Sequence, residues 1–186
     1  GAVTLEWVEE RRQEWGESSP LYQAKVLGQF PVEGSDTLIP LSWVERAINA
    51  AAVGDDRKSI GCDVARFGED ETVVFKCLGN TYELVESVNK RPTNETAGRL
   101  VLVAKESGAE FVAVDDTGVG GGITDILREQ GMSVVPVNFG AAAEDPERFA
   151  NLKAEIFWNL REDFEKGKIS IPDDPTLVNQ LASIKY

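Results

Sequence analysis

The chain has 186 residues with a formal net charge of −13, and at this length it supports one domain with a substantial core. A hydrophobic fraction of 42% and a charged fraction of 27% are typical of soluble globular proteins. The absence of histidine excludes Ser-His and Cys-His nucleophilic catalysis and zinc sites built on imidazole, while the acidic excess argues against tight unaided binding of nucleic acid and suits divalent cations.

The first 57 residues are predicted to form a lead-in segment outside the core. Residues 3–15 have the pattern of a short amphipathic helix with Thr4 as its N-cap. Residues 40–52 predict a second helix, which has proline early and Ser42-x-x-Glu45 as a capping box. We therefore expect a domain boundary after residue 57.

Residues 58–186 carry the pattern of the core domain. Runs with strand and helix character follow in the order β-β-β-α-β-α-β-α-β, at 58–66, 71–79, 81–89, 94–108, 110–116, 121–131, 133–139, 145–167 and 168–172. Gly79-Asn80 predicts a tight turn, and the mostly apolar run at 110–116 predicts a strand buried on both faces. A further helix or strand begins at residue 175. This order indicates an α/β fold, with a mixed sheet and helices on its faces.

Two cysteines, Cys62 and Cys77, lie in neighbouring apolar runs and lack the spacing of a metal site. They are predicted to be small core residues, and a disulfide is the less favoured alternative.

Acidic residues lie at two points where ligands bind in α/β sheets. Asp63 is central in the first core strand, and Asp115-Asp116 ends the fourth. If these two strands pair in parallel, their acids meet at one edge of the sheet, outside the carboxyl ends of the strands. Carboxylates in that position repel each other unless a cation lies between them, and Mg²⁺ or Mn²⁺ is the natural ligand. The alternative is a strand end and a turn, which we would favour for each acid alone but not for the set.

A glycine-rich turn that includes Gly120 and Gly121 follows the second acidic position and leads into a helix. It suits a phosphate cradle or a close approach to nucleic acid, whereas the alternative is a turn that needs positive φ angles. It lacks the Gly-Lys-Ser/Thr ending of a P-loop, so ATP hydrolysis by that route is set aside. Arg66 and Lys153 are weak candidates for contacts with the DNA backbone, with solvated surface positions as the alternative.

The chain resembles the nuclease domain of the large terminase subunit of tailed bacteriophages over nearly its whole length. Four segments carry the resemblance in the family's order: SPLYQAKVLGQFPVEGSDTLIPLSWVERA, GCDVARFGEDETVV, VAVDDTGVGGGITDIL and FANLKAEIFWNLREDFEKGKISIP. Each segment alone is weak evidence, but the four in this order are specific.

The resemblance implies an RNase H-like mixed sheet flanked by helices on both faces. It also implies a metal-dependent endonuclease that cuts concatemeric double-stranded DNA by hydrolysis with two Mg²⁺ or Mn²⁺ ions. Residues 1–57 would join a preceding ATPase domain to a nuclease domain at 58–186.

The family's metal-binding acids carry over by position. Asp63 matches the first acid and Asp115 the second, Asp116 replaces Asp115 if the register differs by one, and Asp125 is expected to support the site from the next helix. The family's third acid lies downstream of LASIKY, beyond Tyr186. Asp173 and Asp174 come too early to match it, so we expect the C-terminal part of the domain to be missing from this sequence.

The resemblance further implies partners and a location. The partners are double-stranded DNA, the ATPase domain of the same polypeptide, the small terminase subunit and the portal protein. No membrane partner is expected, since no apolar run approaches the length of a membrane span. The expected location is the host cytoplasm, transiently on the procapsid.

Two rival functions remain at this point. The run DVARFGEDET also suits the first hairpin of an actin-like or sugar-kinase-like ATPase, although 186 residues leave little room for the second half that such folds need. A catalytically idle RNase H-like docking module is the other rival, with its acids only ending strands.

Overall fold

The computed structural model describes residues 3–29, 36–51, 54, 56–65, 71–89, 91–117 and 120–186. Within them, five strands form one mixed sheet in the order β3-β2-β1-β4-β5. The strands are β1 (Lys58–Asp63), β2 (Glu71–Leu78), β3 (Thr81–Asn89), β4 (Phe111–Asp115) and β5 (Val134–Val137). The first three form antiparallel pairs, whereas β4 pairs in parallel with both β1 and β5. The first and fourth core strands thus meet the condition under which their acids are expected to lie at one edge of the sheet.

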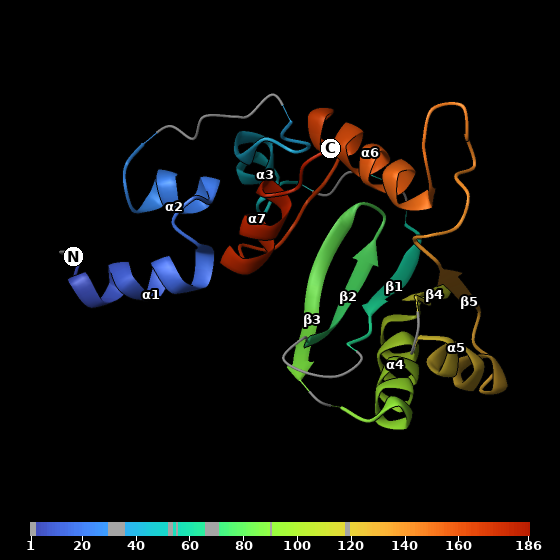
Figure 1. Ribbon diagram of the computed structural model, residues 1–186. Helices are drawn as coiled ribbons and strands as arrows, with labels where there is room; N and C mark the ends of the chain where they lie inside the picture. Colours follow the sequence, from blue (N-terminus) through green and yellow to red (C-terminus); the bar gives the residue numbers. More distant parts are fainter. Residues whose placement is uncertain are drawn as a thin grey trace.

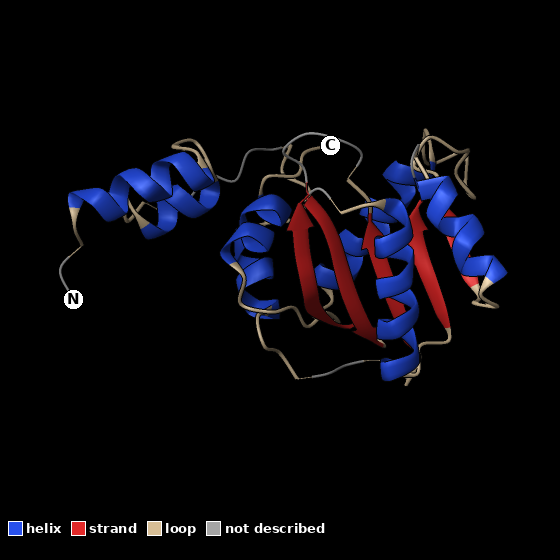
Figure 2. Cartoon of the chain, turned by 90° about the horizontal axis from the view of Figure 1, so that it is seen from below, coloured by secondary structure: helices blue, strands red, loops and turns tan. Residues whose placement is uncertain are grey.

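Seven helices are found in the described residues: α1 (Leu5–Trp15), α2 (Pro20–Lys25), α3 (Leu41–Ala47), α4 (Thr93–Ser107), α5 (Gly120–Glu129), α6 (Leu152–Glu165) and α7 (Pro175–Ala182). Helices α4 and α5 cover one face of the sheet, and α3, α6 and α7 lie beyond the opposite face (Figures 1 and 2). The predicted mixed sheet with helices on both faces is therefore confirmed. No helix of the described residues combines the length and apolar character of a membrane span.

One core cluster joins the sheet to α4 and α5. Its fully buried members include Ile60, Val74, Leu100, Val112 and Val114. Strand β4 alternates between buried and half-buried residues, so only one of its faces is buried. The sequence-based prediction that both faces are buried is wrong. The difference arises because α4 and α5 pack against one face of β4, whereas the side chains on its other face, such as Ala113, stay half-buried.

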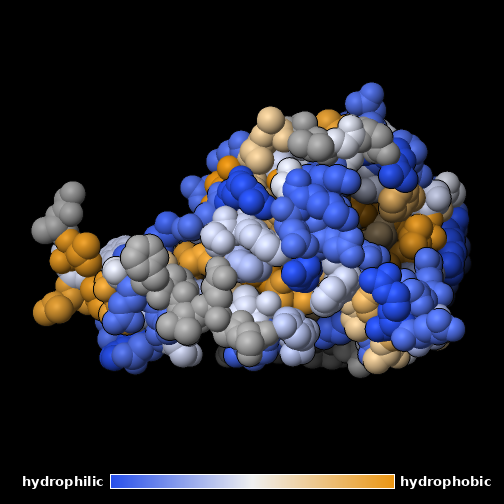
Figure 3. Space-filling view, turned by 90° about the horizontal axis from the view of Figure 1, so that it is seen from above, coloured by the Kyte–Doolittle hydropathy of each residue, from blue (hydrophilic) through white to orange (hydrophobic). Residues whose placement is uncertain are grey.

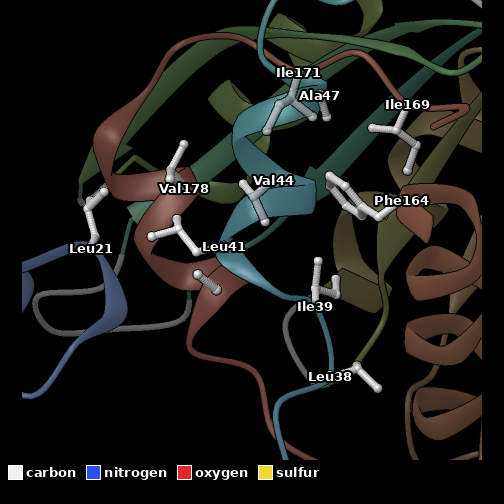
Figure 4. Close-up of a cluster of buried hydrophobic side chains, with 11 residues drawn as sticks. Leu21, Leu38, Ile39, Leu41, Val44, Ala47, Phe164, Ile169, Ile171 and Val178 are labelled. Atoms are coloured by element: carbon white, nitrogen blue, oxygen red, sulfur yellow. The ribbon is translucent and has the colours of Figure 1, made fainter. Parts of the chain in front are cut away.

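A second core cluster connects the two ends of the sequence (Figure 4). It combines residues before the sheet with residues after it: Leu21, Leu38, Ile39, Leu41, Val44, Ala47, Phe164, Ile169, Ile171, Val178 and Ala182. Much of this cluster comes from the predicted lead-in, which was expected to lie outside the core. The domain boundary after residue 57 stays a prediction, but the packing shows that both predicted parts share one core.

Helices α1 and α2 extend from the body of the molecule (Figure 2). Thr4 caps α1 as predicted, because its hydroxyl accepts a hydrogen bond from Trp7 N at 3.2 Å. Helix α2 is capped in the same way by Ser19, whose hydroxyl accepts a hydrogen bond from Tyr22 N at 3.1 Å. Helix α1 buries none of its residues, and Leu5 is 90% exposed. Figure 3 shows hydrophobic surface at this protruding end.

Several element boundaries differ from the sequence-based expectation. Helix α3 stops at Ala47 and has no side-chain cap, so the predicted capping box at Ser42 does not form. Helix α6 begins after Asn151, whose side-chain oxygen accepts a hydrogen bond from Ala154 N at 2.9 Å, instead of near residue 145. The predicted strand at 168–172 reduces to two isolated bridges, of Ser170 with Thr81 and of Ile171 with Ile48.

A partly buried ionic group ties the β2–β3 hairpin to α4. The Glu86 carboxylate on β3 accepts hydrogen bonds from Arg91 and from Arg99 Nε, the latter at 3.0 Å. Burial alone would raise the pKa of Glu86, but the two arginines outweigh it and the pKa is lowered from its ordinary value. The hairpin and the helix are therefore held together by charge as well as by apolar packing.

Both cysteines are free and buried, which confirms that they are core residues and not a disulfide. Burial raises the pKa of the Cys62 thiol to about 12, and the negative charge of the neighbouring Asp63 adds to the effect.

We expect Phe164→Ala to lower the free energy of unfolding by about 3–5 kcal/mol, because it opens a cavity where the two ends of the sequence pack together. Urea unfolding followed by circular dichroism measures this. Ile156→Ala, on the exposed side of the same helix, is the control and should cost less than about 1 kcal/mol. Equal losses for the two variants would contradict the packing described here.

We expect Glu86→Gln to destabilise the protein by about 1–3 kcal/mol at pH 7, because it leaves two arginines without their anion. Since the folded pKa lies below the ordinary value of 4.5, this stabilisation is complete above pH 4.5 and is lost as pH falls through the folded pKa. Urea unfolding of the unmodified protein and of Glu86→Gln between pH 7 and pH 3 measures this. The difference between their free energies of unfolding should become smaller as the pH falls. A difference independent of pH would rule out the ionic origin.

We expect neither cysteine to react with a thiol-specific disulfide reagent at pH 8 in the folded protein, because burial raises the pKa of both thiols. The same protein in denaturant should titrate two thiols. Rapid reaction of the folded protein would show that the β1–β2 region opens to solvent.

Candidate functional site

The register of the two central strands places the predicted acids side by side. Gly61 pairs with Ala113 and Cys62 with Val114, so the next positions of the parallel pair are Asp63 and Asp115. Ile60, Cys62, Val112 and Val114 are buried in the cluster beneath α4 and α5. Because side chains alternate along a strand, Asp63 and Asp115 both project from the opposite face, at the carboxyl ends of their strands.

A cavity of about 630 Å³ adjoins this edge of the sheet. Its sheet wall comes from β1, β2 and β3, its helical wall from α7, and Thr117 contributes from the turn after β4. The lining residues are Asp63, Val64, Ala65, Glu71, Val73, Phe75, Leu84, Ser87, Thr117, Asp174, Thr176, Leu177 and Gln180. Asp63 therefore faces a space large enough for a ligand.

The two neighbouring acids at the end of β4 are held differently. Asp115 Oδ1 accepts a hydrogen bond from Thr117 N at 2.8 Å, which fixes the carboxylate at the edge of the sheet beside β1. Asp116 instead accepts a hydrogen bond from Thr124 Oγ1 at 3.3 Å, and its backbone N donates to Val137 O. This arrangement favours Asp115 over Asp116 as the partner of Asp63.

The other predicted site residues do not gather around this pair. Asp125 is exposed on α5, where it forms an ion pair with Arg128 at 3.8 Å. Lys153 lies over the ring of Phe157 and lines a different cavity beside α6. Gly120 and Gly121 start α5, and Arg66 lies outside the described residues. Roles for these residues in DNA or metal binding stay predictions.

Sequence reasoning missed two acids of the cavity, Glu71 and Asp174. Glu71 was not singled out, and Asp174 was set aside because it comes too early to match the family's third acid, yet both line the cavity together with Asp63. Asp174 Oδ1 accepts a hydrogen bond from Leu177 N at 2.8 Å and caps α7. The Asp-Pro pattern signals this cap, but nothing in the local sequence tells where α7 packs.

The donor set suits a divalent cation in part. Carboxylate oxygens are the ligands that Mg²⁺ and Mn²⁺ prefer, and two of them lie at adjacent strand ends. The described lining of the cavity carries Asp63, Glu71 and Asp174 and no lysine or arginine. However, the described residues contain no cluster of three or more potential metal ligands. Asp63 and Asp115 thus fit a metal centre as two of its ligands.

No family model matches the chain. The terminase large subunit of Thermus phage G20c is 26% identical over 181 residues, which cover 95% of this chain and 35% of that protein. The chain therefore spans about a third of the length of this curated relative.

Two solved structures share the fold. The large terminase nuclease of phage G20c with bound magnesium has a TM-score of 0.63 at 22% identity, over 82% of each chain. A mutant nuclease domain of the large terminase subunit gp2 of bacterial virus Sf6, solved with manganese and beta-thujaplicinol, has a TM-score of 0.69 at 17% identity, over 80% of this chain and 82% of that one. The chain is therefore similar in sequence to a phage large terminase subunit, and it shares its mixed-sheet fold with the nuclease domains of such subunits.

Proposed function

We propose that this domain is the metal-dependent endodeoxyribonuclease of a viral DNA-packaging terminase, which cuts concatemeric double-stranded DNA. The observation that carries the proposal is the register of β1 and β4, which sets Asp63 and Asp115 side by side at one edge of the sheet. Homology to terminase nucleases, including structures with magnesium and manganese, supports it.

In this proposal Asp63 and Asp115 hold the divalent cations, which are two Mg²⁺ or Mn²⁺ ions. A bound cation would supply an activated water and stabilise the charge on the leaving oxygen of the phosphodiester. The chain's own part is to fix the ligands: the backbone N–H of Thr117 orients Asp115, and the ladder to β2 orients Asp63. In this proposal the acids act as metal ligands and not as general bases, which suits a chain without histidine.

The charge of the chain bears on how DNA would be held. With a net charge of −13 and an acidic cavity, the domain repels phosphate unless cations are bound. We propose that other parts of the packaging machine supply most of the affinity for DNA: the ATPase domain of the same polypeptide, the small terminase subunit and the portal protein. The proposed location is the host cytoplasm.

We expect the protein to nick supercoiled plasmid DNA with Mn²⁺ or Mg²⁺ and not with EDTA. Asp63→Ala should lower the rate by about 100-fold or more, since even outer partners of metal ligands are worth 10–100-fold. Cleavage should weaken with added salt, because the contacts of lysine, arginine and bound cations with phosphate weaken as salt rises. Agarose-gel assays of relaxed and linear product measure all three effects.

Asp145→Ala is the matched control, since this aspartate pairs with Arg148 before α6 and lies outside the cavity lining, and it should cut like the unmodified protein. Cleavage that survives Asp63→Ala would contradict the proposed site. If the folded protein cuts no DNA with either metal, the nuclease proposal fails for this chain and the idle docking module becomes the better account.

A further inference from the structure

Helix α7 presents two different faces along its eight residues. Val178 and Ala182 are buried in the second core cluster. Thr176, Leu177 and Gln180 line the cavity that contains Asp63. Their spacing of one and four positions is that of one helix face, so α7 forms a wall of the cavity with side chains of its own.

This wall is held firmly in place. Asp174 caps the helix through Leu177 N at 2.8 Å, and Asn179 Nδ2 donates a hydrogen bond to Trp15 O at 3.2 Å. Its buried side packs against α2 and α3. Groups on the cavity side are therefore carried by a helix that is fixed against α2 and α3, and such a fixed support is what positioning a substrate requires.

The chemistry of the described lining limits what can hold a phosphate there. The charged side chains of the lining are Asp63, Glu71 and Asp174, all acidic. Thr176 and Gln180 are neutral, exposed hydrogen-bond donors on the wall opposite the sheet. Side chains of threonine and glutamine commonly bind phosphate oxygens in protein–DNA complexes, without bringing a positive charge.

We propose that Gln180, assisted by Thr176, is a positioning residue that binds the phosphate backbone of the DNA strand and holds it opposite Asp63. Leu177, between them, packs against the sugar. A cavity of about 630 Å³ accepts a short stretch of one strand. The inference rests on the proposed nuclease function and assigns it a substrate-binding wall from α7, which local sequence reasoning did not identify.

The test compares Gln180→Ala, Gln180→Glu and Gln180→Lys with the unmodified protein. Binding of a fluorescein-labelled DNA duplex is measured by anisotropy at low salt, with Ca²⁺ and separately with EDTA, and cleavage kinetics are measured with Mn²⁺. Gln180→Ala should weaken binding and raise KM by about tenfold, because it removes one hydrogen bond to a charged group, while kcat stays within about twofold. Gln180→Glu should bind more weakly still, and Gln180→Lys at least as well as the unmodified protein.

Gln130→Ala is the control, because this exposed glutamine follows α5 outside the cavity lining, and it should change neither binding nor KM. Circular dichroism confirms that each variant is folded. If the Gln180 variants match Gln130→Ala while Mn²⁺-dependent cleavage persists, the inference is overturned and the nuclease proposal stands. If Gln180→Ala and Gln180→Glu weaken binding by a protein that does not cut, the inference survives and the nuclease proposal fails. Absence of DNA binding by the unmodified protein under both conditions overturns the inference.

Discussion

The parallel pairing of β1 with β4 is the constraint on which the site depends. A shift of one residue in this register would turn the acid of one strand to the face covered by α4 and α5, where a carboxylate would be desolvated. Valines on the covered face of β4 and Ile60 on β1 prevent that shift, because each would lose its place in the core. Apolar packing on one face thus fixes the positions of two acids on the other.

Two core clusters meet around the cavity and hold its opposite walls. The cluster beneath α4 and α5 holds the sheet, and the ionic group at Glu86 ties the hairpin of β2 and β3 to α4. The second cluster holds α7 against segments from both ends of the sequence. The relative placement of Asp63 and Gln180 therefore depends on residues that lie far from either in sequence, and disturbance of the second cluster would alter the cavity wall that α7 forms.

The parts of the fold that follow from local pattern were predictable. The hairpin of β2 and β3 turns at Gly79, which has a φ of 55°, and α4 ends at Gly108 in the left-handed conformation. Other element boundaries were predicted wrongly because a second local pattern competed with the first. Helix α6 is capped by Asn151 and not by the acid-rich stretch before it, and Pro40 and not Ser42 occupies the N-cap position of α3. The core that residues before the sheet share with residues after it could not be predicted from local pattern. Each segment's sequence shows that it has an apolar face but does not show which other segment packs against that face.

The same division applies to the site. The meeting of Asp63 and Asp115 was predictable because strand pattern is local and one topological rule joins the strand ends. Asp63 is, however, the last residue of β1 and not, as was predicted, central in it, because the strand ends three residues earlier than its pattern indicates. Asp174 and the cavity side of α7 were not, because tertiary packing alone brings them opposite the sheet. The resulting cavity has acids at its charged positions and neutral donors on its far wall, so under the proposed function cations that offset the carboxylates would favour the entry of a phosphate. In a strongly acidic domain, DNA engagement at the proposed site would then depend on the bound metal.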